Sequence, residues 1–163
     1  MPIHGPQQSQ AGHDHGVRVI GYARVNAAPD QQPRLLDLQW ERMRRFALAQ
    51  PGWAIVGEFS DVTARRPASR LPALRQAITE AVAGGCDVFL VDSLDRVSRL
   101  ICEFTTVAEE LNRAGVTLWS ATERFNGGTP SGHFALQVLL AAAEYERMHS
   151  RFEWAARARR GRG

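Results

Sequence analysis

The chain has 163 residues, of which 44% are hydrophobic and 23% are charged. This length and composition suit one soluble domain that buries a sizeable core. No apolar run approaches the ~20 residues that a membrane-spanning helix needs, and residues 1–16 lack the pattern of a secretory signal. We therefore expect a cytoplasmic protein with no membrane association.

The positive charge of the chain is concentrated at its C-terminal end. The net charge is +3, and residues 144–163 hold six arginines and three glutamates, which accounts for all of it. A basic segment of this kind favours a polyanionic partner such as DNA, bound weakly through its phosphate backbone. The arginines of this segment that we expect to contact DNA phosphates are Arg147, Arg151, Arg157, Arg159 and Arg160.

Strands and helices are predicted to alternate along the chain, after a leader over residues 1–16 that we expect to be disordered. Apolar runs predict strands over residues 17–25, 53–59, 87–91 and 116–121. Apolar residues at helical spacing predict helices that begin at Pro33, Pro72 and Ile101. This alternation indicates an α/β fold over residues 17–132, with a mostly parallel sheet of four to five strands flanked by helices.

A long helix is predicted over residues 133–160, followed by a basic tail end at 161–163. The residues of this helix that repeat with the heptad spacing of a helix–helix seam are Phe134, Val138, Ala141, Tyr145, Met148, Phe152 and Ala155. Because the stretch 134–143 is apolar on nearly every side, we expect it to be buried. A helix of ~27 residues is ~40 Å long, which exceeds the span of a compact domain of this size. We therefore expect a homodimer or tetramer through this helix, or DNA lying beside it.

Charged and polar residues gather after the predicted strands, where open parallel sheets bind their ligands. The residues in question are Arg24 and Asn26 after the first strand, Asp61 after the second, and Asp95, Arg96 and Arg99 after the third. Clustered arginines stabilise the charge that develops on a phosphoryl group, and a neighbouring aspartate can orient them or transfer a proton. The pattern predicts a phosphodiester site, with a surface ion-pair network as the alternative for any single pair.

Taken in order, these motifs resemble the catalytic domain of the serine recombinases, the family of resolvases, invertases and large serine integrases. Tyr22-Ala23-Arg24-Val25 matches the first family motif, and Leu36-Asp37-Leu38-Gln39 matches a motif at the opening of a helix. Leu94-Asp95-Arg96-Val97-Ser98-Arg99 matches the leucine–aspartate–arginine motif with both of its arginines. Thr129-Pro130-Ser131-Gly132 and Glu144-Tyr145-Glu146-Arg147 match the long helix of the family.

The resemblance implies an enzyme that cuts DNA through a serine hydroxyl, needs no metal or other cofactor, and rejoins the strands within a tetramer. By the same resemblance, Arg24, Arg96 and Arg99 bind the scissile phosphate, and Asp95 assists near the leaving oxygen. The remaining positions for which the resemblance implies contact with phosphate or DNA are Tyr22, Gln39, Asp61 and Arg70.

The nucleophile is the gravest departure from the family pattern. Asn26 stands where the family has its serine, and a carboxamide cannot form a phosphoserine-type ester. Ala27 offers no hydroxyl in its place. The serines at positions 60, 93 and 98 fall elsewhere in the pattern, and we expect none of them to reach the site. Leu71 stands where the family has an arginine, for which the adjacent Arg70 is a candidate substitute.

Departures continue towards the C-terminus. His133 replaces an arginine, Ser150 falls where an isoleucine is expected, and the chain stops where a DNA-binding domain would begin. We therefore expect a domain associated with site-specific recombination that is catalytically impaired, a pseudoenzyme without a DNA-binding domain. Two alternatives stay open. One is an active recombinase or nickase that uses another nucleophile or a partner's serine, and the other is an α/β domain that binds a small anionic ligand.

Overall fold

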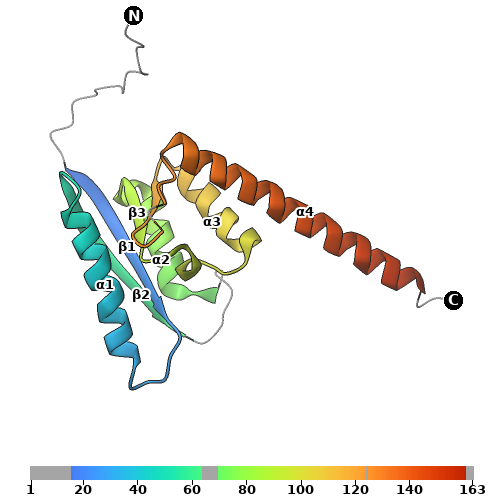
Figure 1. The fold of residues 1–163 in the computed structure, drawn as a ribbon, viewed down its shortest axis with the longest axis horizontal. Coiled ribbons are helices and arrows are strands. Elements are labelled where there is room, and N and C mark those ends of the chain that lie inside the picture. Colours follow the sequence, from blue (N-terminus) through green and yellow to red (C-terminus); the bar gives the residue numbers. More distant parts are fainter. Residues whose placement is uncertain (1–15, 64–69, 124, 161–163) are drawn as a thin grey trace, which may run out of the picture.

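A four-stranded parallel sheet forms the centre of the fold in the computed structural model of the chain (Figure 1). The four strands are β1 (Val17–Val25), β2 (Trp53–Val62), β3 (Val88–Val91) and β4 (Thr117–Ser120). Their order across the sheet is β2-β1-β3-β4, and each neighbouring pair is parallel. The predicted fold class is confirmed.

The structure describes residues 16–63, 70–123 and 125–160, and for residues 143, 147 and 150–160 it describes only the course of a helix. The predicted leader, apart from Gly16, and the predicted tail end at 161–163 therefore lie outside the described residues.

The two edges of the sheet differ from the prediction in detail. Strand β2 runs on to Val62, so Asp61 lies within the strand, opposite Arg24 in the register, and not after it. At the other edge, Trp119 forms an antiparallel bridge with Asn126, and the Gly127 N–H donates to the Leu118 carbonyl at 2.9 Å. These contacts pair part of the outer side of β4 with the chain that leads to the last helix.

Helices cover both faces of the sheet. Three of them are α1 (Gln32–Leu48), α2 (Pro72–Glu80), which continues as a π-helical turn η2 (Ala81–Gly85), and α3 (Ile101–Arg113). Helix α1 packs on one face of the sheet, while α2 and α3 pack on the other (Figure 1). A short 3-10 helix, η3 (Leu94–Arg96), follows β3 and carries the leucine–aspartate–arginine motif.

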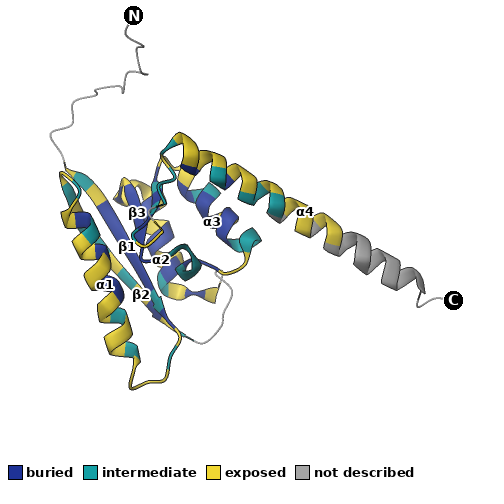
Figure 2. Cartoon of the chain, in the orientation of Figure 1, coloured by how far each residue is buried: buried dark blue, intermediate teal, exposed yellow. Residues whose placement is uncertain are grey.

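Strand β1 is buried on both faces over Val19–Ala23, which explains the apolar sequence between Arg18 and Arg24 (Figure 2). Val19 packs with α1, and its neighbour Ile20 packs with α2 on the opposite face. Helix α1 approaches β1 closely at Gly21, where a Cβ atom would come within 2.7 Å of the Trp40 ring. This approach brings Gln39, the residue before Trp40, to the carboxyl end of β1.

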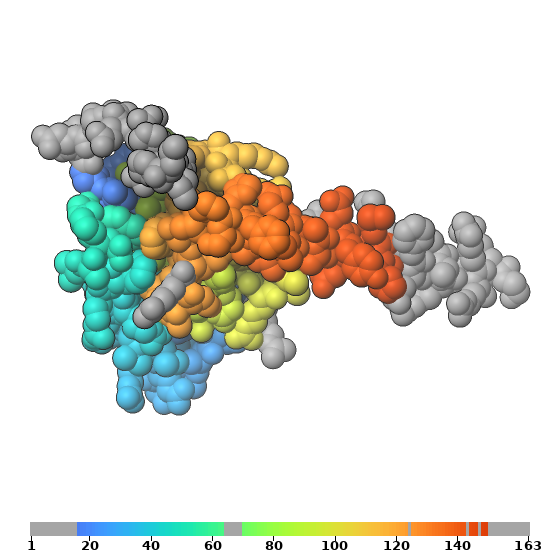
Figure 3. Space-filling view, turned by 45° about the horizontal axis from the view of Figure 1, so that its top comes forward, coloured from blue at the N-terminus to red at the C-terminus, as the bar shows by residue number. Residues whose placement is uncertain are grey.

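Helix α4 (Pro130–Arg160) is 31 residues long and projects beyond the body of the domain (Figure 3). It confirms the predicted long helix, although it begins earlier than residue 133. Proline is favoured in the first helical turn, because its missing N–H leaves no hydrogen bond unmade there. Among the described residues, no helical segment combines the length and the hydropathy that a membrane span requires.

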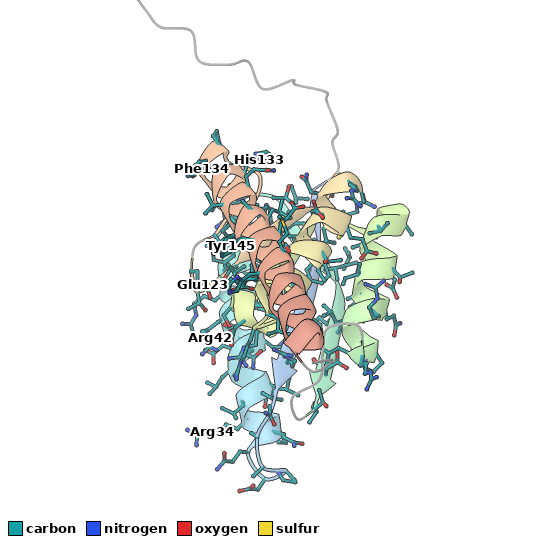
Figure 4. The ribbon with its side chains drawn as sticks, turned by 90° about the vertical axis from the view of Figure 1, so that its right-hand side faces the viewer. Arg34, Arg42, Glu123, His133, Phe134 and Tyr145 are labelled. Atoms are coloured by element: carbon teal, nitrogen blue, oxygen red, sulfur yellow. The ribbon has the colours of Figure 1, made fainter. Side chains whose placement is uncertain are left out.

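Only one side of α4 packs on its own domain, so the expected burial of the whole stretch 134–143 is wrong for the single chain. Leu136 is buried in the core that α3 lines, and Leu139 packs against the same core. Phe134, Val138 and Tyr145 are 70%, 51% and 69% exposed, and Figure 4 shows Phe134 and Tyr145 on the same side of the helix. We refer to the exposed heptad residues Phe134, Val138, Ala141, Tyr145 and Met148 as the α4 stripe.

Candidate phosphate-binding site

The candidate site lies where β1 and β3 end side by side. The two strands are hydrogen-bonded neighbours, with Tyr22 opposite Val91 at the last paired position. The chain leaves β3 into helix η3, which carries Asp95 and Arg96, and Arg24 is the next-to-last residue of β1. Parallel pairing therefore brings these three residues, predicted separately from two motifs, to one edge of the sheet.

Arg24 and Arg96 each hold the backbone that carries the other. The Arg24 Nη2 donates to the carbonyl oxygen of Asp95 at 2.6 Å, and the Arg96 Nη1 donates to the carbonyl oxygen of Arg24 at 3.2 Å. A guanidinium has five N–H donors, so these bonds leave donors on each arginine for an anion. The side chain of Arg96 is 28% exposed, which keeps it accessible from solvent.

Asp95 forms the acidic centre of this cluster. Its carboxylate accepts a hydrogen bond from the Ser93 hydroxyl and lies 3.5 Å from Arg96 Nε and 3.8 Å from Arg99 Nε. The Ser93 hydroxyl also accepts a bond from Arg96 Nε at 3.2 Å. Ser93 therefore contacts two of the predicted site residues, and the expectation that it does not reach the phosphate stays a prediction. Two arginines thus lie at the Asp95 carboxylate, and Arg24 adds a third positive charge at the Asp95 backbone carbonyl.

Gln39 fixes the backbone of Arg24 from the side of α1. Its Nε2 donates to the Arg24 carbonyl at 3.0 Å, and its Oε1 accepts the Arg24 N–H at 3.2 Å. One side-chain amide thus pairs both backbone groups of Arg24, much as a neighbouring strand would. Gln39 is only 4% exposed, so the structure gives it a supporting place behind Arg24 instead of direct access to a ligand.

Tyr22 and Asp61 are also buried and bind one another. The Tyr22 hydroxyl donates to Asp61 Oδ2 at 2.9 Å, and burial, reinforced by the Asp61 carboxylate, raises the pKa of Tyr22. The carboxylate of Asp61 accepts the N–H groups of Ala73 and Leu74 at 3.2 and 3.0 Å, in the first turn of α2. Both side chains therefore hold α2 against the sheet, and neither exposes a polar atom to a phosphate as the resemblance implied.

Asn26 is exposed directly after the end of β1. Among the described residues, its carboxamide makes no hydrogen bond within the usual limits, so it is not committed to a structural role there. Arg70 is exposed beside the fully buried Leu71, which belongs to the core. Because an unpaired guanidinium is not tolerated in such a core, Arg70 is the position of this pair that can carry a surface arginine. Its contact with phosphate stays a prediction.

The basic residues on the distal part of α4 are not brought to this edge by any described contact. The side chains of Arg147, Arg151, Arg157, Arg159 and Arg160 lie outside the described residues, so their phosphate contacts stay predictions. Within the described part of the chain, no group of three or more His, Cys, Asp or Glu side chains is placed to hold a metal ion.

Sequence reasoning missed an ion pair next to the site, in which a buried aspartate binds a half-exposed arginine. Asp92 directly follows β3 and is 2% exposed, and Arg42 of α1 binds it through Nε and Nη2, each at 2.7 Å. This paired hydrogen bond to Asp92 raises the pKa of Arg42. The Thr122 hydroxyl adds a bond to Asp92 Oδ1 at 3.3 Å. The position of Asp92 directly after a strand could have been noticed in the sequence. Nothing in the sequence indicated that Arg42 of α1 binds it.

A separate hollow lies between α3 and α4. Its volume is about 110 Å³, and its lining includes Glu109, Arg113, His133 and Leu136. All of the lining residues come from these two helices, so the hollow is not part of the arginine cluster at the sheet edge. His133, which replaces an arginine expected from the family pattern, is placed at this hollow.

Comparisons with known proteins agree with this geometry. The family described as Resolvase, N terminal domain matches residues 19–163. A probable DNA-invertase of Sinorhizobium fredii is 32% identical over 130 residues, which cover 80% of this chain and 38% of that protein. The DNA-invertase of Escherichia phage P1 is 30% identical over 129 residues, which cover 79% of this chain and 62% of that protein.

A solved structure shares the fold. The crystal structure of a resolvase family site-specific recombinase from Streptococcus pneumoniae matches with a TM-score of 0.74 and 22% identity, covering 90% of this chain and 99% of that one. At this identity the likeness shows the fold alone.

The chain belongs to the serine recombinase family, through the resolvase-type N-terminal domain. Its named relatives are DNA invertases, resolvases and serine recombinases, so the predicted family is confirmed, while a role of this chain in site-specific DNA recombination stays a prediction. The chain spans 38% and 62% of the length of the two invertases compared above.

Proposed function

We propose that this domain binds the DNA backbone in the cluster of Arg24, Arg96 and Arg99, and that Asn26 prevents the covalent cleavage step. The main support for the proposal is that the side chains of Arg24 and Arg96 each donate a hydrogen bond to the backbone of the other's segment, beside an exposed Asn26. A braced guanidinium loses little freedom when it binds, and its planar fork matches the non-bridging oxygens of a phosphodiester.

The missing step is a matter of nucleophile chemistry. In the family reaction a serine oxygen attacks phosphorus, a serine–phosphorus bond forms, and the bond to the 3′ oxygen breaks. The lone pair of an amide nitrogen is delocalised into its carbonyl, so Asn26 is a very poor nucleophile and cannot give the ester. The arginines can still hold the ground-state phosphodiester, because that interaction needs charge and hydrogen-bond donors only.

We also propose that the α4 stripe pairs with a second copy of the chain, giving a homodimer or tetramer. The stripe places Phe134, Val138 and Tyr145 on a side of the helix that its own domain leaves exposed. Heptad spacing on an exposed helix side is the pattern by which two helices pack side by side. The arginines further along α4 then lie beyond the domain body, where they can follow a DNA backbone.

A binding measurement with a covalent readout tests the proposal. A labelled DNA duplex is titrated with wild-type protein over a range of salt concentrations, and supercoiled plasmid is examined for protein–DNA adducts. We expect salt-sensitive binding without adducts. Absence of binding contradicts the proposal and favours a small anionic ligand. An adduct on wild-type protein supports another nucleophile, and Ser93 is the first position to map, because it contacts Asp95 and Arg96.

A further inference from the structure

The turn that carries Asp95 and Arg96 is held from outside the predicted motifs. Glu123 follows β4, and its two carboxylate oxygens accept the Leu94 N–H at 3.2 and 3.3 Å. The same carboxylate accepts the Ser120 hydroxyl, which ties Glu123 to the end of β4. Figure 4 shows Glu123 on the side of the molecule where Arg42 lies.

The Leu94 N–H needs a partner from another segment. Leu94 is the first residue of η3, and the first N–H groups of a helix have no acceptor within the helix. Ser93 occupies the position before the helix, from which a serine side chain caps the second or third N–H and not the first, and it makes no capping bond here. Its hydroxyl is committed to Asp95 instead. Glu123 supplies the missing acceptor from across the sheet edge.

A second set of bonds joins the same two segments. The Asp92 carbonyl accepts the Thr122 N–H at 3.0 Å and the Ser120 hydroxyl at 3.3 Å. The segment Ser120–Glu123 therefore holds the chain on both sides of Ser93, at Asp92 and at Leu94. Of these contacts, the one from Glu123 is nearest in sequence to the arginine and involves a charged group.

We propose that Glu123 is a positioning residue that sets the place of Arg96 for phosphate binding without touching the phosphate itself. The inference rests on the proposed function, because it concerns the same arginine cluster. The proposal and an argument from charge alone predict opposite effects on DNA affinity when Glu123 is removed. Removing a carboxylate near an anion site strengthens DNA binding if charge alone matters. Removing a positioning carboxylate weakens it.

Three variants separate these readings. Glu123→Ala removes the acceptor, and Glu123→Gln removes the charge but keeps a carbonyl oxygen for the Leu94 N–H. Glu109→Ala is the matched control, since Glu109 is an α3 glutamate paired with Arg113 at 3.8 Å and outside the cluster. We expect DNA affinity to fall about fivefold to tenfold in Glu123→Ala, because a hydrogen bond to a charged group is lost. Affinity in Glu123→Gln and Glu109→Ala stays equal to wild type or rises.

The salt dependence of DNA binding reports the number of phosphate contacts, which a change in the stability of the protein does not alter. If Arg96 no longer contacts a phosphate, the slope of log affinity against log salt becomes less steep by about one in Glu123→Ala, as in Arg96→Ala. Combining the two substitutions then adds little to Arg96→Ala alone. Hydrogen exchange at the Leu94 amide should be faster in Glu123→Ala than in wild type, which confirms that the contact itself was removed.

Two different failures are distinguishable. If wild-type protein does not bind DNA, the proposed function is wrong, and the inference is wrong with it. If wild-type protein binds DNA, but Glu123→Ala binds as tightly as wild type with an unchanged salt slope, the positioning role alone is overturned. A loss of affinity that Glu123→Gln shares in full also overturns it, because this variant keeps an acceptor for the Leu94 N–H and the loss then does not come from removing that hydrogen bond.

Discussion

The Arg24 guanidinium donates to the backbone that carries Arg96, and the Arg96 guanidinium donates back to the carbonyl of Arg24 itself. Each arginine is therefore placed by the chain segment of the other, at the ends of two neighbouring strands. A site built this way loses the position of one arginine when the other is removed. Their effects on binding should not be independent.

We expect Arg24→Ala and Arg96→Ala each to weaken DNA binding by about tenfold to a hundredfold, because a charge-assisted contact to phosphate is worth roughly 1.5–3 kcal/mol. The double variant should lose less than the sum of the two. Anisotropy titrations with a DNA duplex measure all three. Arg113→Ala is the control, since its side chain is 78% exposed on α3. Equal losses in Arg113→Ala and Arg24→Ala mean that net charge, and not the site, governs binding.

Gln39→Ala should disturb the same arginine through its backbone. The Arg24 N–H loses its side-chain partner, while the Arg24 carbonyl keeps its bond from Arg96, and an unsatisfied buried polar group costs roughly 1–3 kcal/mol of unfolding free energy. Urea denaturation measures this loss. Gln76→Ala is the control, because the Gln76 side chain bonds to the exposed side chain of Glu80. A Gln39 variant as stable as the Gln76 variant contradicts the proposed support of Arg24.

The stability of the domain should fall in alkaline solution through Cys86. Burial raises the pKa of this thiol from an ordinary value of 9.0 to about 11. Below pH 9 the thiol is protonated in both the native and the unfolded chain. Between pH 9 and about 11 the unfolded chain releases its proton while the native chain retains it, so unfolding becomes more favourable.

Cys86→Ala tests this assignment. Between pH 9 and 11, the unfolding free energy of Cys86→Ala should fall by up to about 2 kcal/mol less than that of wild type. Urea denaturation at each pH measures both free energies. Cys102→Ala serves as the control with the other free cysteine. Parallel pH profiles for wild type and Cys86→Ala show that other groups cause the alkaline loss.

Val138→Glu should separate subunits without unfolding them. Val138 is 51% exposed in the single chain, so a glutamate there is solvated in a monomer but is buried against apolar side chains in a paired seam. Light scattering gives the mass of each species, and circular dichroism confirms the fold. Leu48→Glu, at an 85% exposed position on α1, should leave the mass unchanged. A wild-type protein that stays monomeric at high concentration contradicts the proposed pairing.

The sequence was sufficient to predict the elements that carry a local signal. The apolar run of β1 and the leucine–aspartate–arginine motif after β3 predicted which residues meet at the sheet edge, because parallel strands end on the same side. Contacts between distant segments gave no such signal. The pairs Arg42–Asp92 and Glu123–Leu94 join residues from separate elements whose approach depends on the whole fold.

Helix α4 shows a different limit of sequence reasoning. Its apolar residues occur on two sides, and hydropathy alone does not say which side meets its own domain. Leu136 turned out to face α3, while Phe134 and Val138 stayed exposed. Burial of Tyr22 and Asp61 was likewise invisible in a motif match, which records residue types and not their access to solvent.

Covalent trapping with and without a serine at position 26 is the most direct test of the central claim. Wild-type protein and Asn26→Ser are incubated with a nicked or strained duplex, and protein–DNA adducts are resolved by denaturing electrophoresis and mapped by mass spectrometry. We expect wild type to bind the duplex without an adduct, and any adduct of Asn26→Ser to map to position 26. An adduct formed by wild-type protein contradicts the claim that Asn26 blocks cleavage.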